Sequence, residues 1–275
     1  MVLRIAVVTD IHYGIDVGVK KGTEAPRLIE DFIDAADQFK ADYILNLGDS
    51  VSSQDPASDT KFRTALRAQF KRAACPVLEI DGNHDVRYQA RQSPSDRVIT
   101  HDHHIILWNP YLNRYTREGV IPDPQDIEWL ENEINSAQKP VILLSHIPFA
   151  GPESKRKKLK AESVQTLYYP SFFEKPKKLK TLVESSGKVL LCLSGHRHLN
   201  YTEHSNGTHH VIQQSMVEIV ENGQPSGAYS MIEVDAHEIR IKGFGLQQPA
   251  LTVLPLKSAG SNQNAPPAPS VPKSA

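Results

Sequence analysis

Five short motifs along this 275-residue chain contain the residue types that bind metal ions and move protons. Each motif directly follows an apolar run that is typical of a buried β-strand. The motifs are Asp10-Ile11-His12, Gly48-Asp49, Asp81-Gly82-Asn83-His84-Asp85, His146 and Gly195-His196-Arg197-His198. In open α/β sheets, ligands bind at the edge where parallel strands end. We therefore expect these side chains to converge in space although they span about 190 residues of sequence.

The candidate metal ligands in these motifs carry carboxylate, amide or imidazole groups and no thiolate. They are Asp10, His12, Asp49, Asn83, His146, His196 and His198. Mixed oxygen and nitrogen ligands favour Mn, Fe or Zn over calcium sites and iron–sulfur clusters. This many ligands exceeds the need of one catalytic ion with open positions, and it suits two ions that share a ligand. Two ions ~3.5–4 Å apart polarise a phosphoryl oxygen, generate hydroxide near neutral pH and stabilise in-line displacement.

The elements that must position these residues alternate between strands and helices. The expected strands are Leu3–Thr9, Tyr43–Leu47, Val77–Ile80, Ile105–Trp108, Val141–Ser145 and Val189–Ser194. Helical spacing of apolar residues predicts helices over Pro26–Lys40 and Asp59–Ala73, and a third that begins at Asp123-Pro124. This order predicts a mostly parallel sheet with helices on its outside.

After Gly195 the pattern changes to strands without intervening helices. The expected strands are Thr208–Gln214, Ala228–Val234 and Glu238–Phe244. They predict a β-meander that forms a second sheet packed on the first. Residues 258–275 are rich in Pro, Ser and Ala, which predicts a disordered tail after a catalytic domain at residues 1–257.

The composition excludes several classes of protein. The 31 basic and 32 acidic residues give a net charge of −1, which argues against binding nucleic acid by bulk charge. No apolar run approaches the ~20 residues of a membrane span, and the N-terminus lacks a signal-peptide pattern. Cys75 and Cys192 each lie in an apolar run and are interpreted as buried thiols. We expect a cytoplasmic protein without membrane or nucleic-acid partners; its oligomeric state is left open.

Together the five motifs resemble the signature of the calcineurin-like metallophosphoesterases, over most of residues 3–245. The resemblance implies an α/β fold, a four-layer α/β/β/α sandwich of two mixed β-sheets with a two-metal site at the carboxyl ends of the strands. By the family's pattern, Asp10, His12 and His198 hold one ion, Asp49 bridges both, and Asn83, His146 and His196 hold the other.

The resemblance also implies the catalytic groups. A metal-bridging hydroxide attacks phosphorus directly, and His84 binds the phosphate and protonates the leaving oxygen. Asp85 is expected to hydrogen-bond His84 and to favour its protonated form. Asn83 and Arg197 are further candidates for substrate contact.

The expected substrate is a small, nucleotide-like phosphate mono- or diester, and three alternatives stay open. The segments Gln125–Glu133, Val141–His146 and Gly207–Val211 are also similar to the branch that hydrolyses ADP-ribose-type and CDP-alcohol-type diphosphates. His12 stands where that branch is expected to have Gln. A nuclease or a catalytically inactive scaffold of the same fold is the remaining alternative.

Other polar segments are assigned no chemistry. His101-Asp102-His103-His104 is predicted to be a solvated loop. The same is expected of His209-His210, where the period-2 alternation of a strand places one side chain on each face. The basic run Lys155–Lys160 is expected to be a solvated loop that could gather anionic substrates. Arg87 and Tyr88 are weaker candidates for substrate contact.

Overall fold

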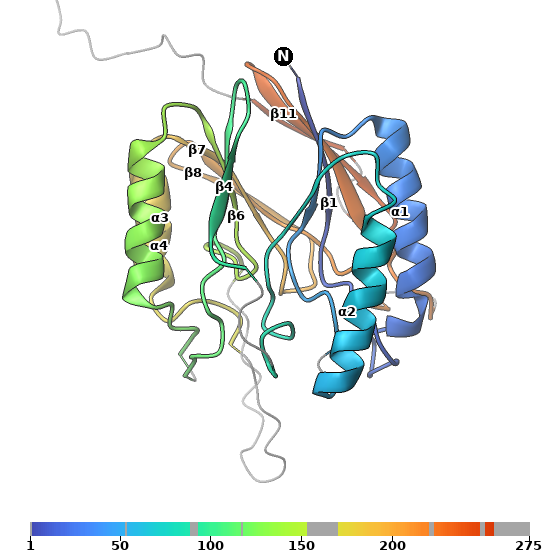
Figure 1. Cartoon of the computed structure of the whole chain (residues 1–275). Helices are drawn as coiled ribbons and strands as arrows, with labels where there is room; N and C mark the ends of the chain where they lie inside the picture. Colours follow the sequence, from blue (N-terminus) through green and yellow to red (C-terminus); the bar gives the residue numbers. More distant parts are fainter. Residues whose placement is uncertain are drawn as a thin grey trace, which may run out of the picture.

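Two six-stranded β-sheets face each other at the centre of this computed structural model, with helices outside both (Figure 1). The structure describes residues 2–52, 54–88, 93–116, 118–152, 170–219, 223–247 and 251–255. The arrangement confirms the predicted four-layer α/β/β/α sandwich.

The first sheet has the strand order β12-β11-β10-β1-β2-β3. Its strands are β1 (Leu3–Val8), β2 (Tyr43–Asn46), β3 (Val77–Glu79), β10 (Tyr229–Val234), β11 (Glu238–Phe244) and β12 (Leu251–Pro255). β1, β2 and β3 are parallel, whereas β10, β11 and β12 continue the sheet in antiparallel pairs. The first three motifs therefore follow the three parallel strands of this sheet.

The second sheet has the order β4-β5-β6-β7-β9-β8. Its strands are β4 (Asp96–Ile99), β5 (His104–Leu107), β6 (Val141–Leu144), β7 (Val189–Ser194), β8 (Tyr201–Ser205) and β9 (Thr208–Ile212). The inner strands β5, β6, β7 and β9 are parallel, and β4 and β8 close the two edges in antiparallel pairs. The other two motifs follow β6 and β7.

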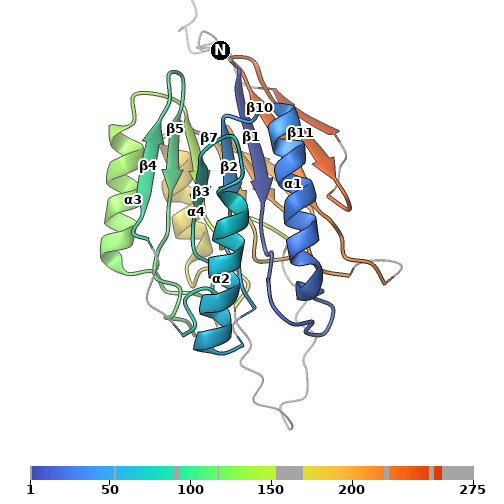
Figure 2. The same ribbon diagram turned by 45° about the vertical axis from the view of Figure 1, so that its right-hand side comes forward.

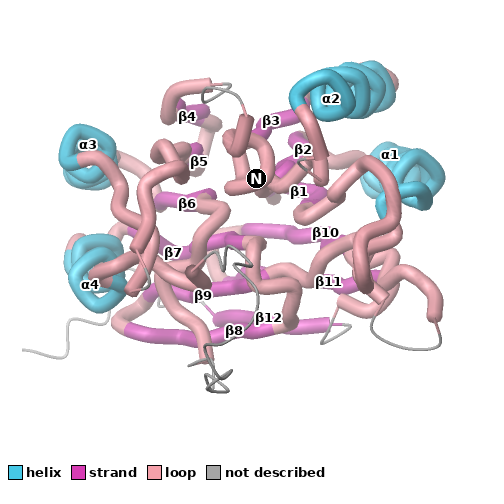
Figure 3. The backbone as a smooth tube through the Cα atoms, turned by 90° about the horizontal axis from the view of Figure 1, so that it is seen from below, coloured by secondary structure: helices cyan, strands magenta, loops and turns pink. Residues whose placement is uncertain are grey.

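In the described ranges, four α-helices form the outer layers, two on each sheet, as Figures 2 and 3 show. α1 (Ala25–Phe39) and α2 (Pro56–Phe70) cover the first sheet, and α3 (Pro124–Ser136) and α4 (Pro176–Ser185) cover the second. Each begins with a proline in its first two positions, where a missing N–H costs no helical hydrogen bond. A short 3₁₀ helix (Gly22–Glu24) leads into α1. In the described part of the chain, no helix is long and apolar enough to cross a membrane.

Consecutive apolar residues in the motif strands are explained by burial on both faces. In β1, Ile5 and Val7 pack between the two sheets, while Ala6 and Val8 pack under the helices. β6 repeats the pattern toward α3 and α4. Strands covered on both faces lose the apolar–polar alternation of a one-sided sheet, as predicted.

The predicted β-meander is wrong. β9 lies in the second sheet, parallel to β7, whereas β10 crosses to the first sheet and pairs with β1. The propensity of each strand was visible in the sequence, but its partner depends on where the chain crosses between sheets. The strands β4, β8 and β12 and the helix α4 were not predicted.

The expected solvated environment of the two histidine segments is also wrong for four side chains. His103, His104, His209 and His210 are all buried. His104 Nε2 lies 3.0 Å from Glu133 Oε1 of α3, and His210 Nε2 lies 2.8 Å from Glu184 Oε1 of α4. The imidazoles of His104 and His210 thus join the second sheet to its helix layer. Each is buried beside a glutamate that lies far away in the sequence.

Leu191→Ala tests the packing between the sheets. Leu191 is fully buried in the inter-sheet core, so its truncation should lower the free energy of unfolding by about 2–5 kcal/mol. Ile99→Ala is the control, because Ile99 is 60% exposed and should cost less than about 1 kcal/mol. Urea denaturation followed by circular dichroism measures both. Equal losses would contradict the assigned core.

Candidate metal centre

The loops that follow β1, β2, β3, β6 and β7 meet at one end of the sandwich, which Figure 3 views end-on. Backbone hydrogen bonds continue the sheet ladders into these loops. Asp10 N–H donates to Gly48 O and His12 N–H donates to Asp49 O, both at 2.9 Å. In the second sheet, Gly195 N–H donates to His146 O at 3.2 Å. The convergence predicted from strand ends is therefore present, across two sheets rather than one.

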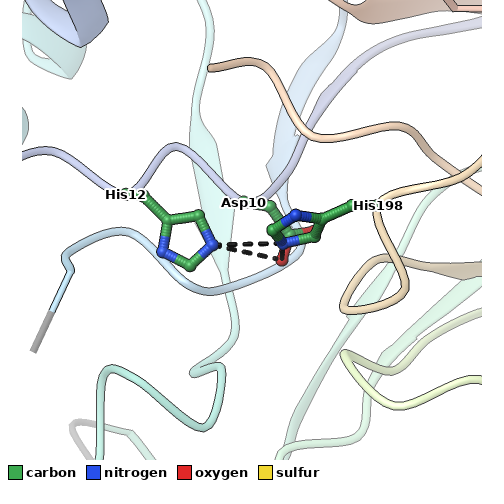
Figure 4. Close-up of side chains that lie close together, drawn as sticks. All are labelled: Asp10, His12 and His198. Atoms are coloured by element: carbon green, nitrogen blue, oxygen red, sulfur yellow. Dashed lines mark hydrogen bonds and ion pairs between the residues drawn. The ribbon is translucent and has the colours of Figure 1, made fainter. Parts of the chain in front are cut away.

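Asp10, His12 and His198 form the first group of predicted ligands (Figure 4). His12 Nε2 lies 3.2 Å from His198 Nε2, and His198 Nε2 lies 3.0 Å from Asp10 Oδ1. Asp10 Oδ1 is 3.8 Å from His12 Nε2. Two imidazole nitrogens and a carboxylate oxygen that point at one another form a donor set that suits a cation.

Asp49, His146 and His196 form the second group. His146 Nε2 lies 3.5 Å from Asp49 Oδ1 and 3.3 Å from Asn83 Oδ1. The other oxygen of Asp49, Oδ2, lies 3.7 Å from His12 Nε2 in the first group. Asp49 thus stands between the two groups, with one carboxylate oxygen toward each.

The second ring nitrogen of three of these histidines meets an acceptor outside the groups. His146 Nδ1 lies 2.8 Å from Leu47 O, and His196 Nε2 lies 3.0 Å from Pro170 O. A carbonyl only accepts, so the ring nitrogen that faces it carries a proton, and the other nitrogen is the one directed toward the groups. His198 Nδ1 faces the Glu218 carboxylate in the same way. Such partners fix the tautomer and orientation of metal-binding imidazoles.

Glu218 was not predicted from the sequence. It lies in the loop between β9 and β10, 20 residues from the histidine that it contacts, and no motif surrounds it. The carbonyls of Leu47 and Pro170 were missed for a different reason, since a backbone carbonyl has no residue type that would mark it.

The backbone of the site is held in an uncommon conformation. Five predicted ligands have positive φ: Asp10 (50°), His12 (44°), Asp49 (53°), His196 (67°) and His198 (47°). The other non-glycine residues with positive φ in the described ranges are Lys40, at the end of α1, and Asn206, in the β8–β9 turn. Left-handed backbone is uncommon for residues with a Cβ, and although Asp and His adopt it more readily than most, it persists where the surroundings enforce it. The strain is therefore concentrated at the site.

Two motif glycines are required by close approach. A Cβ at Gly82 would overlap the Asp49 carboxylate, and a Cβ at Gly195 would overlap Thr9 Oγ1 and Asp10 Oδ2. These positions let the motif loops of different strands touch directly.

Buried negative charge dominates the electrostatics. Burial alone would raise the pKa of Asp10 and Asp49, but neighbouring imidazoles, mainly His198 and His146 respectively, hold both values below the usual range. Conversely, burial opposes protonation of His146 and His198, yet Asp49 and Asp10 raise the pKa of each to about 9. Burial lowers the pKa of His12, and it lowers that of His196 to about 3. The carboxylates thus require positive charge at two places.

The positive charge that the two carboxylates require can be compared with the charge that two metal ions would supply. The imidazoles of His198 and His146 balance this charge when they are protonated, and two cations would supply positive charge at the same places. The two donor groups, their shared carboxylate and the oriented imidazoles all fit a pair of ions. Among the described residues, the buried Nδ1 of His12 has no hydrogen-bond partner.

His84 lies beside the bridging carboxylate. Its backbone N–H donates to Asp49 Oδ1 at 2.8 Å, and its Nε2 is 4.0 Å from Asp49 Oδ2. Its Nδ1 lies 3.2 Å from Ser52 O, and its side chain is 24% exposed. His84 therefore reaches the site from the side that solvent can enter.

Asp85 does not take the role expected for it. In place of a bond to His84, its carboxylate accepts from the backbone N–H groups of Ser50 and Gly82, and pairs with Arg63 at 3.3 Å. Burial raises the pKa of Asp85 to about 7, and burial lowers that of His84. Asp85 holds the second and third motif loops together, and the expectation that it keeps His84 protonated is not met.

Comparison with known protein families matches residues 3–200 to one family, described as calcineurin-like phosphoesterases. The chain belongs to the calcineurin-like phosphoesterase family. The resemblance inferred from the five motifs is therefore confirmed. The curated proteins contain no match to the sequence.

Solved structures with the same fold include phosphatases and a protein with another description. A dimetal phosphatase from Danio rerio has a TM-score of 0.75 at 12% identity, over 93% of this chain and 99% of that one. Purple acid phosphatase PPD1 from yellow lupin has 0.61 at 12%, over 100% and 57%. GAP50, the anchor in the inner membrane complex of Plasmodium, has 0.58 at 14%, over 94% and 90%. These similarities show a shared fold.

Arg197 and Arg87, two further candidates from the sequence, each lie over an aromatic ring. Arg197 Nη1 donates to Pro152 O at 3.0 Å, and its guanidinium lies 4.6 Å from the centre of the Phe172 ring. Arg197 thus joins the two segments that flank residues 153–169. Arg87 packs over the ring of Tyr88. The basic run Lys155–Lys160 and the tail at residues 258–275 lie outside the described residues.

Glu218→Gln tests the orientation of His198. The change removes the carboxylate that faces Nδ1, so affinity for Mn²⁺ or Zn²⁺ should fall ~10–100-fold. Glu24→Gln makes the same change of charge at an exposed residue paired with Arg27, and should leave the affinity unchanged. Competition with a chelator measures both. Equal affinity of the two variants would show that Glu218 does not orient a ligand.

Proposed function

We propose that the chain is a two-metal phosphoesterase that hydrolyses a small, nucleotide-like phosphate mono- or diester. The observation that carries the proposal is the position of Asp49, whose Oδ1 faces His146 and whose Oδ2 faces His12. One carboxylate placed between two donor groups is the arrangement that a pair of ions requires. The ions are Mn, Fe or Zn, because the donors are oxygen and imidazole nitrogen.

The proposed ligands follow the two groups. Asp10, His12 and His198 hold one ion, Asn83, His146 and His196 hold the other, and Asp49 bridges them. When bound, the pair polarises the phosphoryl oxygen and activates water for attack on phosphorus. Leu47 O, Pro170 O and Glu218 keep three of the imidazoles in the orientation and tautomer that binding needs.

His84 supplies the proton in the proposed reaction. Ser52 O holds one proton at Nδ1, so the proton for the leaving oxygen is carried at Nε2, the nitrogen on the Asp49 side. Burial lowers the pKa of His84, and a bound phosphate acts in the opposite direction because it is an anion beside the ring. Substrate binding thus prepares the acid that expels the leaving group.

The domain boundaries and location belong to the same proposal. Residues 1–257 form the catalytic domain, 258–275 form a tail outside it, and the protein acts in the cytoplasm without a nucleic-acid or membrane partner. Asn83 and Arg197 are proposed to contact the substrate. The net charge of −1 supports a small substrate over a polyanion.

Asp49→Asn tests the bridge. One variant should lower the metal content from about two ions per chain toward one or none and abolish turnover, because both ions lose a charged ligand. Asp31→Asn is the control, since Asp31 is an exposed carboxylate on α1. Elemental analysis of the purified proteins measures the content. Unchanged occupancy in Asp49→Asn would contradict the bridging role.

His84→Ala separates acid from ligand. The variant should keep its metal content and lose ~10²–10⁴-fold in kcat, as expected for removal of a general acid. His84 also lies within ligand distance of His12 and Asp49, so the alternative has a clear signature. Parallel losses of metal and turnover would make His84 a ligand.

A substrate panel tests the reaction itself. The metal-loaded protein is assayed with a phosphomonoester, a simple phosphodiester, cyclic nucleotides and an ADP-ribose-type diphosphate, each with Mn, Fe, Zn and Mg. Turnover of an ester supports the proposal, whereas exclusive turnover of the diphosphate favours the alternative branch. Fewer than about one bound ion per chain under metal-replete conditions, with no turnover, would indicate an inactive scaffold.

A further inference from the structure

The segment between β1 and α1 brings a lysine to the edge of the metal centre. Figure 2 shows this dark blue segment at the lower end of the sandwich, where β1 ends. Lys20 lies in it, and its Nζ is 3.5 Å from Nε2 of His84. None of the five motifs includes Lys20, and the sequence alone gives it no role.

The backbone of Lys20 is firmly placed. Lys20 and Val17 exchange two backbone hydrogen bonds of 3.0 Å around a turn in which Gly18 has a φ of 57°. Ile219 N–H donates to Val19 O at 2.7 Å, and Lys21 N–H donates to Val217 O at 2.9 Å. The segment therefore pairs with the loop that carries Glu218, the partner of His198. Lys20 is fixed relative to the predicted ligands.

The charge of Lys20 is directed toward the site. Within the described part of the chain its Nζ forms no ion pair, whereas the neighbouring Lys21 pairs with Asp16 at 3.0 Å. Burial is the main cause of the lowered pKa of His12 and His84, and Lys20 adds to the lowering at both. Its positive charge thus acts where the phosphate would bind.

A cation at this place distinguishes substrates by their charge. A phosphomonoester carries between one and two negative charges at neutral pH, because its second pKa is about 6. A phosphodiester carries one, and one of its oxygens bears a second carbon substituent. An ammonium group beside the phosphoryl group stabilises the dianion more than the monoanion.

We propose that Lys20 is a specificity-determining residue that binds a non-bridging phosphoryl oxygen and selects phosphomonoester dianions over phosphodiester monoanions. This inference rests on the proposed phosphoesterase function and narrows its substrate class. Lys20 stands on the side of His84, so the oxygen that it binds is adjacent to the leaving group.

The test compares one monoester and one methyl diester with the same aryl leaving group. In the full-length, metal-loaded chain, Lys20→Met should lower kcat/KM for the monoester ~10–100-fold, the range for hydrogen bonds to charged groups, and for the diester less than ~3-fold. Lys20→Arg keeps the charge and should retain most of the preference. Lys21→Met is the matched control with the same change of net charge, and should alter neither rate more than ~2-fold.

A binding measurement makes the test independent of turnover. Calorimetry with inorganic phosphate and with dimethyl phosphate, above the second pKa of phosphate, should show Lys20→Met weakening only the phosphate complex. Metal content is measured for every variant and should not change. Equal losses with both ligands, or none, would overturn the proposed selectivity.

The outcomes separate this inference from the function on which it rests. If the wild type holds two ions and hydrolyses neither ester, the proposed function fails, while the two binding affinities still decide the role of Lys20. If Lys20→Met still prefers the monoester over the diester, the proposed phosphoesterase function stands and Lys20 does not determine specificity.

Discussion

The burial of two carboxylates between the ends of two sheets is the constraint on which the site depends. Asp10 and Asp49 are enclosed where burial alone would neutralise them, and a buried carboxylate stays ionised only beside positive charge. The neighbouring imidazoles of His198 and His146 are placed to provide that charge when they are protonated. Metal ions held by the same groups would satisfy the same requirement. The fold therefore requires positive charge beside each of the two carboxylates. The backbone of the motif loops keeps these two positions apart.

The backbone, more than side-chain packing, sets this separation. Left-handed φ values at five predicted ligands cost roughly 1–3 kcal/mol each, which local sequence preference does not supply. The ladders that join β1 to β2 and β6 to β7 continue into the motif loops and impose these angles. Gly82 and Gly195 then allow loops from different strands to approach without a Cβ between them. The stable pairing of the strands thus holds the motif loops at the end of the sandwich in their left-handed conformations.

The sequence was sufficient for the parts of this arrangement that are local. Continuous apolar runs predicted the motif strands because burial on both faces leaves its trace within each strand, and the motifs predicted which side chains would meet. Three features were not local. The partner of β9 depends on a chain crossing, the burial of His104 depends on Glu133 in a later helix, and the orientation of His198 depends on Glu218 in a distant loop. The roles of Leu47 O and Pro170 O could not be read at all, because every residue has a carbonyl.

The non-local features also explain how one set of motifs can serve different substrates. The motifs contain the predicted ligands and the proposed proton donor, whereas the segment around Lys20 lies outside them and pairs with the loop of Glu218. The pairing connects two segments of the site. One carries Glu218, which faces the predicted ligand His198, and the other carries the ammonium group of Lys20 beside His84. A change in this paired segment would alter the charge that a substrate meets while the five motifs stay the same. Under the role proposed for Lys20, substrate choice has its physical basis in a part of the chain that lies outside the five motifs.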